Sequence, residues 1–287
     1  MTVPHWLVKK IPDYHDFYRV NRAVSLVDTV CRNAACPNIM ECYSRGHVTF
    51  LILGKHCTRK CKFCAVEHQE PLPVDPLEPG RIVETARKLK LSHVVVTSVT
   101  RDDLEDGGAA QFAQTIKVLR REVDASIEVL IPDFKGSFSA LEKVVEAAPD
   151  VLAHNLETVR RLQPLIRPGA DYRRSLKLLT WVKEINPGML TKSSLIFGMG
   201  EEDKEIAETL RDVKSTGCDI LTMGQYRRPG NGQIPVQRFI LEEGFRYWED
   251  YAYGLEYKRV FSGTYVRSSY RAGEIKDLLG IQDVEQS

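Results

Sequence analysis

Residues Val48-Thr-Phe-Leu-Ile-Leu-Gly-Lys-His-Cys-Thr-Arg-Lys-Cys-Lys-Phe-Cys64 join an apolar run to three closely spaced cysteines. The run 48–53 is typical of a buried strand, and a glycine ends it. Cys57, Cys61 and Cys64 follow at once in a C-x3-C-x2-C spacing. Three thiolates on one short loop hold three irons of a cubane [4Fe–4S] cluster and leave the fourth iron open to another ligand. The stretch therefore predicts a strand whose C-terminal end carries an iron–sulfur cluster.

A second cysteine triplet lies upstream, where Cys31, Cys36 and Cys42 have a C-x4-C-x5-C spacing. Two triplets predict two iron–sulfur clusters. A disulfide framework is disfavoured, because such frameworks belong to short secreted chains and this chain has 287 residues with seven cysteines, an odd number. Structural zinc and unligated thiols remain the alternatives, although zinc usually takes four ligands from two close pairs. Cys218 stands alone in an apolar stretch and is expected to be a core residue.

Downstream of the first strand, short apolar runs alternate with longer amphipathic segments. Further strands are expected at 93–97, 127–131, 151–154, 192–197 and 219–223, and helices at 79–90, 109–123, 138–147, 172–185 and 201–216. Such alternation indicates an α/β fold with a parallel sheet and right-handed crossovers. Six units are too few for an eight-stranded barrel, so we expect an open, partial (β/α)6 TIM-type barrel whose mouth lies at the C-terminal ends of the strands.

The rest of the chain flanks this barrel on both sides. We expect an irregular N-terminal arm at 1–46 that carries the first triplet, the barrel at 47–240, and a C-terminal extension at 241–287 that closes the barrel. A long loop is expected at 225–240. Within the extension we expect a helix at 241–255, a short strand at 259–261 and a helical tail at 274–279.

Composition gives no support for several classes of protein. The formal net charge is +1, which gives no argument for a nucleic-acid partner or a membrane surface. No apolar run approaches the length of a membrane helix, and the first residues have neither a signal-peptide nor a transit-peptide pattern. Cysteine-rich loops without a secretion signal indicate a reducing compartment, so we expect a cytoplasmic protein.

The spacing after the first strand, with the aromatic Phe63 before the last cysteine, resembles the signature of the radical S-adenosylmethionine (SAM) superfamily. The resemblance implies that the amino and carboxylate groups of SAM bind the open iron. It also implies that one electron from the cluster breaks the bond between sulfur and C5′ of SAM, and that the resulting 5′-deoxyadenosyl radical removes hydrogen from an unactivated carbon.

Three other segments agree with this resemblance. Asp106-Gly107-Gly108 follows the second strand, where the superfamily places a glycine-rich segment against the SAM amino group, although a plain turn would look the same. Asn155 and Glu157 follow the fourth strand. A carboxylate at this place can bind the ribose hydroxyls of SAM, or it can simply stabilise the N-terminus of a helix. The basic side chains of Arg174 and Lys192 have two interpretations: they contact the SAM carboxylate or the substrate, or they are exposed to solvent. The resemblance thus implies cofactor contacts by Asp106, Gly107, Gly108, Asn155, Glu157 and Arg174.

The first triplet together with Arg267-Ser268-Ser269-Tyr270 narrows the resemblance to the lipoyl synthase family. The match covers most of the chain. It includes the segments Pro4–Leu7, Cys36–Cys42, Cys57–Val66, Thr97–Leu104, His154–Thr158, Arg167–Tyr172, Gly224–Tyr226 and Pro235–Arg238.

The family resemblance implies a substrate and a role for each cluster. The substrate is an octanoyl chain on a lysine of a lipoyl carrier protein, either the glycine cleavage H protein or a 2-oxoacid dehydrogenase E2 domain. Its C–H bonds at C6 and C8 become C–S bonds. The auxiliary cluster, held by Cys31, Cys36 and Cys42, supplies the sulfur. Its fourth ligand is a serine of the C-terminal motif, Ser269 first and Ser268 next, because a hydroxyl binds a soft cluster iron weakly. An electron donor and an iron–sulfur carrier that rebuilds the cluster are implied partners.

This chain departs from the family pattern at Ser194, where glycine is usual, in the loop 228–235 and at Thr264-Tyr265. The departures leave carrier preference and loop geometry open. Two other hypotheses remain: another two-cluster radical SAM enzyme, such as a methylthiotransferase, and a non-enzymatic interaction module stapled by zinc.

Overall fold

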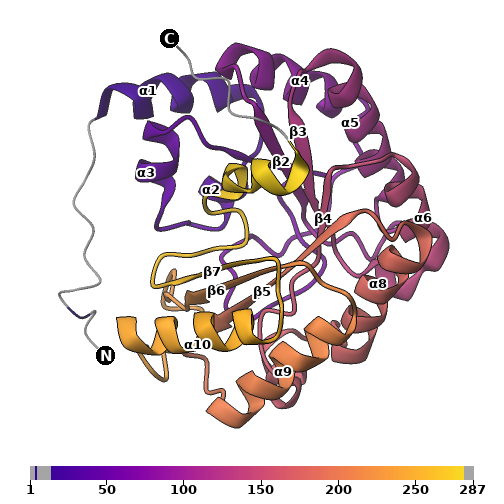
Figure 1. Cartoon of the computed structure of the whole chain (residues 1–287). Helices are drawn as coiled ribbons and strands as arrows, with labels where there is room; N and C mark the ends of the chain where they lie inside the picture. The colour runs from indigo at the N-terminus through magenta and orange to yellow at the C-terminus, as the bar shows by residue number, and fades with distance from the viewer. Residues whose placement is uncertain (1–3, 5–13, 281–287) are drawn as a thin grey trace.

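The computed structural model describes residue 4 and residues 14–280, and within these residues seven parallel strands form one sheet in sequential order (Figure 1). The strands are β1 (Thr49–Ile52), β2 (His93–Ser98), β3 (Ser126–Leu130), β4 (Val151–Ala153), β5 (Leu190–Phe197), β6 (Ile220–Gln225) and β7 (Arg259–Gly263). Each strand pairs in parallel with its neighbours, and β1 and β7 form the two edges of the sheet. The sheet is therefore an open barrel, as the sequence predicts.

Helices connect successive strands and lie along the outer side of the curved sheet (Figure 1). They are α4 (Glu78–Leu89), α5 (Ala109–Glu122), α6 (Phe138–Glu146), α8 (Tyr172–Ile185), α9 (Asp203–Ser215) and α10 (Glu242–Gly254). Short turns of helix interrupt two loops, at η3 (Phe134–Gly136), η4 (Arg160–Leu162) and α7 (Gln163–Ile166). Local sequence sets the ends: the side chain of Asp171 accepts a hydrogen bond from the Arg174 amide at 2.7 Å and so caps α8.

The sheet has one strand more than the six βα units that the sequence predicts. The expected short strand at 259–261 extends to Gly263 and pairs in parallel with β6, and α10 makes the crossover. The strand is only partly buried, so its alternation of apolar and polar residues is weak. Strand β6 runs two residues beyond its predicted end, because Gly224 and Gln225 continue the ladder although they lack the apolar side chains that mark a strand in the sequence.

Most of the described N-terminal arm is helical, so the expectation of irregular structure at 1–46 is wrong for residues 14–26, 30–33 and 39–44. It contains α1 (Tyr14–Ala23), η2 (Val24–Leu26), α2 (Val30–Asn33) and α3 (Ile39–Ser44). Helices of three to ten residues show little periodicity in sequence and depend on tertiary packing. Here Phe17 stacks on the buried Tyr43 ring at 5.7 Å, and the amide of Leu51 donates to Asp28 O at 2.9 Å. The arm therefore packs against β1.

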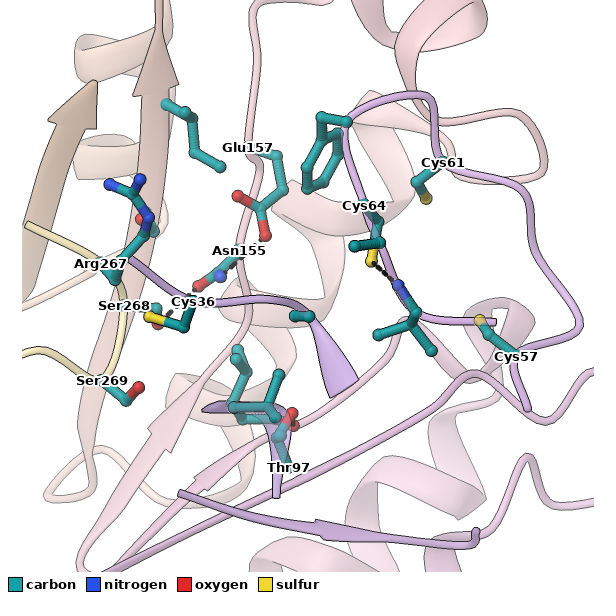
Figure 2. Close-up of a pocket in the computed structure, with 18 of the residues that line it drawn as sticks. Cys36, Cys57, Cys61, Cys64, Thr97, Asn155, Glu157, Arg267, Ser268 and Ser269 are labelled. Atoms are coloured by element: carbon teal, nitrogen blue, oxygen red, sulfur yellow. Dashed lines mark hydrogen bonds between the residues drawn. The ribbon is translucent and has the colours of Figure 1, made fainter. Parts of the chain in front are cut away.

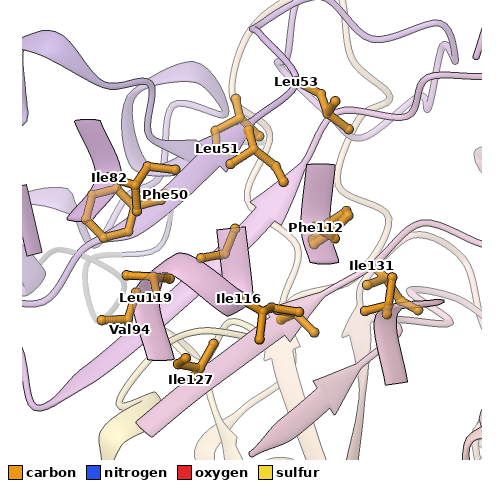
Figure 3. Packing of buried hydrophobic residues seen from close by; sticks show 14 of the residues in the cluster. Phe50, Leu51, Leu53, Ile82, Val94, Phe112, Ile116, Leu119, Ile127 and Ile131 are labelled. Carbon is orange, nitrogen blue, oxygen red and sulfur yellow. The ribbon is translucent and has the colours of Figure 1, made fainter. Parts of the chain in front are cut away.

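The largest part of the core lies between β1, β2 and β3 and the helices α4 and α5 (Figure 3). Phe50, Val94, Ile116 and Leu119 are fully buried there. Cys218 is also fully buried, which confirms the expectation of a core residue. This packing fixes the position of β1 and hence the start of the cysteine loop that follows it.

The C-terminal tail crosses from the mouth of the barrel to the opposite end. Its last described element is η5 (Ala272–Leu279), two residues longer than the expected helical tail. Ile275 of η5 is buried against Val151, Leu190 and Ile220, which stand at the starts of β4, β5 and β6. The tail therefore covers the N-terminal ends of these strands. Among the described residues, no helix is long and apolar enough to cross a membrane.

Candidate cluster and cofactor site

A cavity of about 320 Å³ lies at the C-terminal ends of the strands (Figure 2). The parts of the chain that border it include the cysteine loop after β1, the loops after β4 and β6, the ends of β2 and β3, the N-terminal arm and the C-terminal tail. This is the mouth of the barrel, where the sequence predicts the site.

Cys57, Cys61 and Cys64 all line the cavity, and Figure 2 shows their sulfur atoms around a common space on one side of it. Backbone amides of Arg59 and Val66 lie 3.5 Å from the sulfurs of Cys57 and Cys64. Such N–H groups stabilise cluster sulfur and influence its reduction potential. Burial raises the pKa of Cys61, and raises the pKa of Cys64 to about 12. Burial thus disfavours the thiolate form, which the positive charge of bound iron would favour.

The cysteine loop is fastened to distant parts of the barrel by its backbone. The amide of Thr58 donates to Thr100 O at 3.0 Å, and the amide of Lys62 donates to Ile166 O at 2.8 Å. The loop after β6 reaches across the mouth, where Gln233 Nε2 donates to Cys64 O at 3.1 Å. The loop is thus preorganised for three ligands.

Arg59, between the first two cysteines, is a site residue that sequence reasoning missed. Its guanidinium donates to Asp102 at 2.7 and 3.0 Å and to Asp133 at 3.0 and 2.6 Å. These ion pairs raise the pKa of Arg59 and lower that of Asp133. The two carboxylates follow β2 and β3, so one side chain ties the cysteine loop to two neighbouring strands. No local pattern predicts partners that far away in sequence.

In the first triplet, Cys31 lies on α2 and Cys42 on α3, while Cys36 lies in the segment between these two helices. Cys36 lines the cavity, whereas Cys31 and Cys42 are not among its lining residues. Cys31 is buried, and burial raises its pKa to about 11, with a further contribution from the charge of Cys36. The amide of Cys36 donates to Cys31 O at 3.0 Å, which keeps the two residues on one turn.

The C-terminal tail meets the arm at the same cavity. Arg267, Ser268 and Ser269 line it. On either side of this motif, Asn38 Nδ2 donates to Tyr265 O at 2.6 Å and Tyr270 OH donates to Glu41 Oε1 at 2.9 Å. Two contacts, each more than 220 residues apart in sequence, therefore hold the serines beside the helices that carry the first triplet.

Asn155 and Glu157 also line the cavity, on the loop after β4. Asn155 Nδ2 donates to Glu157 Oε1 at 2.9 Å, and burial raises the pKa of Glu157. Glu157 has a φ of +66°, a strained conformation for a residue with a side chain. Backbone hydrogen bonds with Ser194 and Ile196 of β5 maintain it, at 2.9 and 2.8 Å. Strain that is kept in place by neighbouring structure is typical of binding sites.

Two further basic or titratable groups on this loop escaped sequence reasoning as site residues. Arg167 lines the cavity and donates to the carbonyls of Asn155 and Leu156 at 3.0 and 2.9 Å. His154 bonds Ile131 O at 2.9 Å and Ser175 Oγ at 3.0 Å, and burial lowers its pKa to about 4. Both residues lie inside segments that resemble the lipoyl synthase family, and this resemblance could have identified them as site residues.

The structure does not bring the remaining predicted residues to the cavity: Asp106, Gly107, Gly108, Arg174 and Lys192 are absent from its lining. Asp106 accepts from the amides of Gly108 and Ala110, as a residue in a plain turn does. Arg174 Nε lies 3.0 Å from Asp133, and Lys192 is buried with its Nζ 2.8 Å from Glu128. Contacts of Asp106, Gly107, Gly108 and Arg174 with a cofactor stay predictions.

The arrangement of the cysteines bears on the alternatives to iron–sulfur ligation. All seven cysteines lie in the described part of the chain, and none forms a disulfide. In residue 4 and residues 14–280, no group of three or more His, Cys, Asp or Glu side chains is arranged to hold one metal ion. The thiols that line the cavity border a space rather than converge on a point, which fits a multi-iron cluster.

Comparison with known proteins gives a consistent result. A model of the radical SAM superfamily matches residues 51–213. A lipoyl synthase of Caldanaerobacter subterraneus subsp. tengcongensis is 49% identical over 276 residues, which cover 95% of this chain and 97% of that relative. A lipoyl synthase of Thermus thermophilus is 46% identical and covers 95% of this chain and 86% of the relative.

Solved structures confirm the fold. Methylornithine synthase (PylB) has a TM-score of 0.59 at 12% identity and covers 97% of this chain and 95% of its own. SuiB of Streptococcus suis, bound to S-adenosylmethionine, has a TM-score of 0.56 at 15% identity and covers 78% of this chain and 53% of its own. At sequence identities this low, the similarity shows that the folds are alike and nothing more. The sequence relatives decide the family: this chain belongs to the lipoyl synthase family of the radical SAM superfamily.

Proposed function

We propose that the chain inserts two sulfur atoms, at C6 and C8, into an octanoyl group on a lysine of a carrier protein and so forms a lipoyl group. The observation that carries the proposal is the convergence on one cavity of all three cysteines of the second triplet, Cys36 of the first triplet and Ser269 of the tail. Full-length similarity to lipoyl synthases gives the reaction its name.

Cys57, Cys61 and Cys64 are the proposed ligands of a [4Fe–4S] cluster that binds SAM. When bound, the cluster and SAM supply the one-electron chemistry that breaks unactivated C–H bonds. The chain's own residues hold this centre in place. Arg59 fixes the cysteine loop, and Glu157 with Asn155 offers a carboxylate and an amide to the ribose hydroxyls.

Cys31, Cys36 and Cys42 are the proposed ligands of the second [4Fe–4S] cluster, which donates the sulfur. Ser269 is its proposed fourth ligand. The Ser269 hydroxyl borders the cavity, while the Ser268 hydroxyl donates to Asn155 at 3.0 Å, which favours Ser269 of the two. An alkoxide is a poor ligand for soft iron, so the serine would leave readily when sulfur is released.

The octanoyl chain needs an apolar surface, and the cavity provides one. Leu51, Val99, Leu130 and Ile196 line it. The carrier protein is the partner that presents the octanoyl-lysine at the mouth. We further propose that this carrier is the glycine cleavage H protein or an E2 domain, that an electron donor and an iron–sulfur carrier serve the clusters, and that the reaction takes place in the cytoplasm, where thiols stay reduced.

The test is anaerobic incubation of the reconstituted protein with SAM, a reductant and an octanoyl-lysyl peptide, followed by mass analysis of the peptide. We expect a product with two added sulfur atoms. Ser269→Cys should keep the second cluster yet slow sulfur insertion, because thiolate holds iron more tightly than alkoxide. An unchanged peptide would refute the proposed reaction. Normal insertion by Ser269→Cys, with Ser268→Cys inactive, would move the ligand to Ser268.

A further inference from the structure

We propose that the outer side of the cysteine loop is the docking face for the electron donor, and that this donor is a small acidic iron–sulfur protein of the ferredoxin class. The outer face consists of Lys60, Lys62, Leu165 and Arg228. The inference rests on the proposed function, because the cluster proposed on this loop is the one that takes up the electron.

The cysteine loop carries different side chains on its two sides. Arg59, Cys61 and Phe63 line the cavity, and the cysteine sulfurs lie on this inner side (Figure 2). Lys60 and Lys62, which alternate with them in sequence, are exposed and do not line the cavity. A protein docked on the outer face is therefore separated from the sulfurs by a single stretch of backbone. Because electron transfer slows steeply with distance, a donor benefits from so short an approach.

The loop is positively charged on this outer side. Residues 55–66 contain Lys55, Arg59, Lys60 and Lys62 and no acidic residue. Arg59 is paired with two carboxylates, whereas within the described part of the chain none of the three lysines forms an ion pair. Burial, then the charge of Lys60 and to a smaller extent that of Lys62, lowers the pKa of His68, so both lysines act on one side chain. Uncompensated positive charge of this kind steers an acidic partner.

The outer face extends over two neighbouring elements. The amide of Lys62 donates to Ile166 O at 2.8 Å, and the amide of Ile234 donates to Lys62 O at 3.0 Å, so Lys62 lies between α7 and the loop after β6. Helix α7 adds Leu165, which is 67% exposed. The loop adds Arg228, which is exposed and bonded only to carbonyls of its own loop among the described residues. An apolar side chain among basic groups suits the small, transient interfaces of electron carriers.

The position of the face distinguishes the donor from the octanoyl carrier, which also has to dock. The carrier must deliver its octanoyl-lysine into the cavity, and neither Lys60 nor Lys62 lines the cavity. The donor needs only to come close to the cluster. In the electron-transfer step the reduced donor loses one electron and the cluster gains it. An iron–sulfur carrier exchanges one electron at a time, as this step requires, whereas a flavin stores two.

The experiment uses the reconstituted protein with SAM, octanoyl-lysyl peptide and a reduced, acidic plant-type [2Fe–2S] ferredoxin, and measures 5′-deoxyadenosine at increasing ferredoxin concentration. At about 50 mM salt, Lys60→Glu/Lys62→Glu should lower the second-order rate constant about tenfold or more, because the charges that steer the encounter are reversed. The parent's rate constant should fall with added salt, and the gap should narrow at about 0.5 M salt, where exposed charges are screened.

Two controls isolate docking. The variant Lys88→Glu/Lys117→Glu makes the same change of charge on α4 and α5, where both lysines are exposed, and its rate constant with ferredoxin should stay within about twofold of the parent's. Photoreduced 5-deazaflavin, a small reductant that needs no docking face, replaces ferredoxin in the second control. With it, Lys60→Glu/Lys62→Glu should form 5′-deoxyadenosine at the parent's rate, and its iron content should equal the parent's.

A parent-like rate constant in Lys60→Glu/Lys62→Glu, or an equal loss in Lys88→Glu/Lys117→Glu, would overturn the assignment. A loss that persists with 5-deazaflavin, or a lower iron content, would also overturn it, by showing that the lysines act on the cluster.

The remaining outcomes concern the identity of the partner. A raised KM for the octanoylated carrier with 5-deazaflavin, and no effect with ferredoxin, would overturn the assignment by giving the face to the carrier. A loss with an acidic flavodoxin alone would overturn the choice of an iron–sulfur donor. If the parent forms 5′-deoxyadenosine with ferredoxin but no sulfur-containing peptide, the proposed function fails and the docking face stands.

Discussion

Arg59 illustrates how a single buried charge shapes the site. Its side chain is 7% exposed and bonds the carboxylates of Asp102 and Asp133, which are 25% and 1% exposed. The charge of Arg59 is surrounded by these carboxylates, and Asp133 also contacts Arg174 Nε at 3.0 Å and accepts from the Lys135 amide at 3.1 Å. Removing the guanidinium would leave the buried Asp133 with Arg174 as its remaining guanidinium partner and would take away two of its hydrogen bonds, which costs more than the loss of an exposed ion pair.

We therefore expect Arg59→Gln to lower the free energy of unfolding by about 1.5–3 kcal/mol, the range for lost hydrogen bonds to charged groups, since Arg174 still pairs with Asp133. Its matched control is Arg120→Gln, which removes an exposed pair with Asp150 at 2.8 Å and should cost less than about 1 kcal/mol. Urea unfolding of both variants beside the parent measures the two values. Equal losses would show that the Arg59 pairs do not hold the cysteine loop.

His154 gives a pH dependence whose sign follows from its environment. The imidazole is buried with a pKa of about 4, while in the unfolded chain its pKa is about 6.5. Between these values the unfolded chain binds a proton that the folded chain does not, so stability falls as pH drops from 6.5 towards 4.

His154→Gln should remove this dependence. Between pH 7 and pH 5 the free energy of unfolding of the parent should fall by about 2 kcal/mol more than that of the variant. The reason is that each pH unit below 6.5 lowers the contribution of a neutral buried histidine by about 1.36 kcal/mol. Denaturant unfolding at both pH values measures the difference. Parallel losses in parent and variant would mean that His154 is protonated in the folded protein.

At the scale of elements, the turn that leaves β1 is the most constrained part of the fold. Leu53 and Gly54 have φ values of +67° and +81°, directly before the cysteine loop. The buried carboxylate of Glu78 accepts from both amides, at 2.9 and 3.4 Å, and Arg101 Nη1 donates to Leu53 O at 3.2 Å. Helix α4 and the loop after β2 thus dictate where the cysteine loop begins.

Gly108 packs against this turn. A Cβ atom at Gly108, which has a φ of +91°, would lie 2.2 Å from Leu53 Cδ1. We expect Gly108→Ala to destabilise the protein by about 1–3 kcal/mol more than Gly46→Ala. The control has a φ of +74° with nothing within 4 Å, so it carries the backbone strain alone. Thermal or urea unfolding of the two variants provides the comparison, and equal losses would show that Leu53 moves aside freely.

Most elements could be predicted because each has a local signal. The helix at Tyr172–Ile185 matches its prediction at both ends, since its cap and its periodicity are both in the sequence. The arm could not be predicted in the same way, because α2 has four residues and depends on tertiary contacts. Within the site, the cysteine spacing indicated the loop, whereas Arg59 with Asp102 and Asp133 emerges only when three strand ends meet.

At the scale of the whole molecule, the chain brings its two ends to one cavity. The arm packs against β1, and β7 lies at the other edge of the open sheet. The tail that follows β7 contacts the arm and the loop after β4 at once. The division into an arm at 1–46, a barrel at 47–240 and an extension at 241–287 stays a prediction, as do residues 5–7 of the family match, which lie outside the described residues.

The central claim is that the two cysteine triplets hold separate clusters with different tasks. The most direct measurement compares two variants, with Cys57, Cys61 and Cys64 or Cys31, Cys36 and Cys42 replaced by Ala, for iron, 5′-deoxyadenosine and sulfur-containing peptide. Each variant should keep about half of the parent's iron. The first should form no 5′-deoxyadenosine. The second should form it and yet make no sulfur-containing peptide. Lipoyl product from the second variant, or normal 5′-deoxyadenosine formation by the first, would contradict the account.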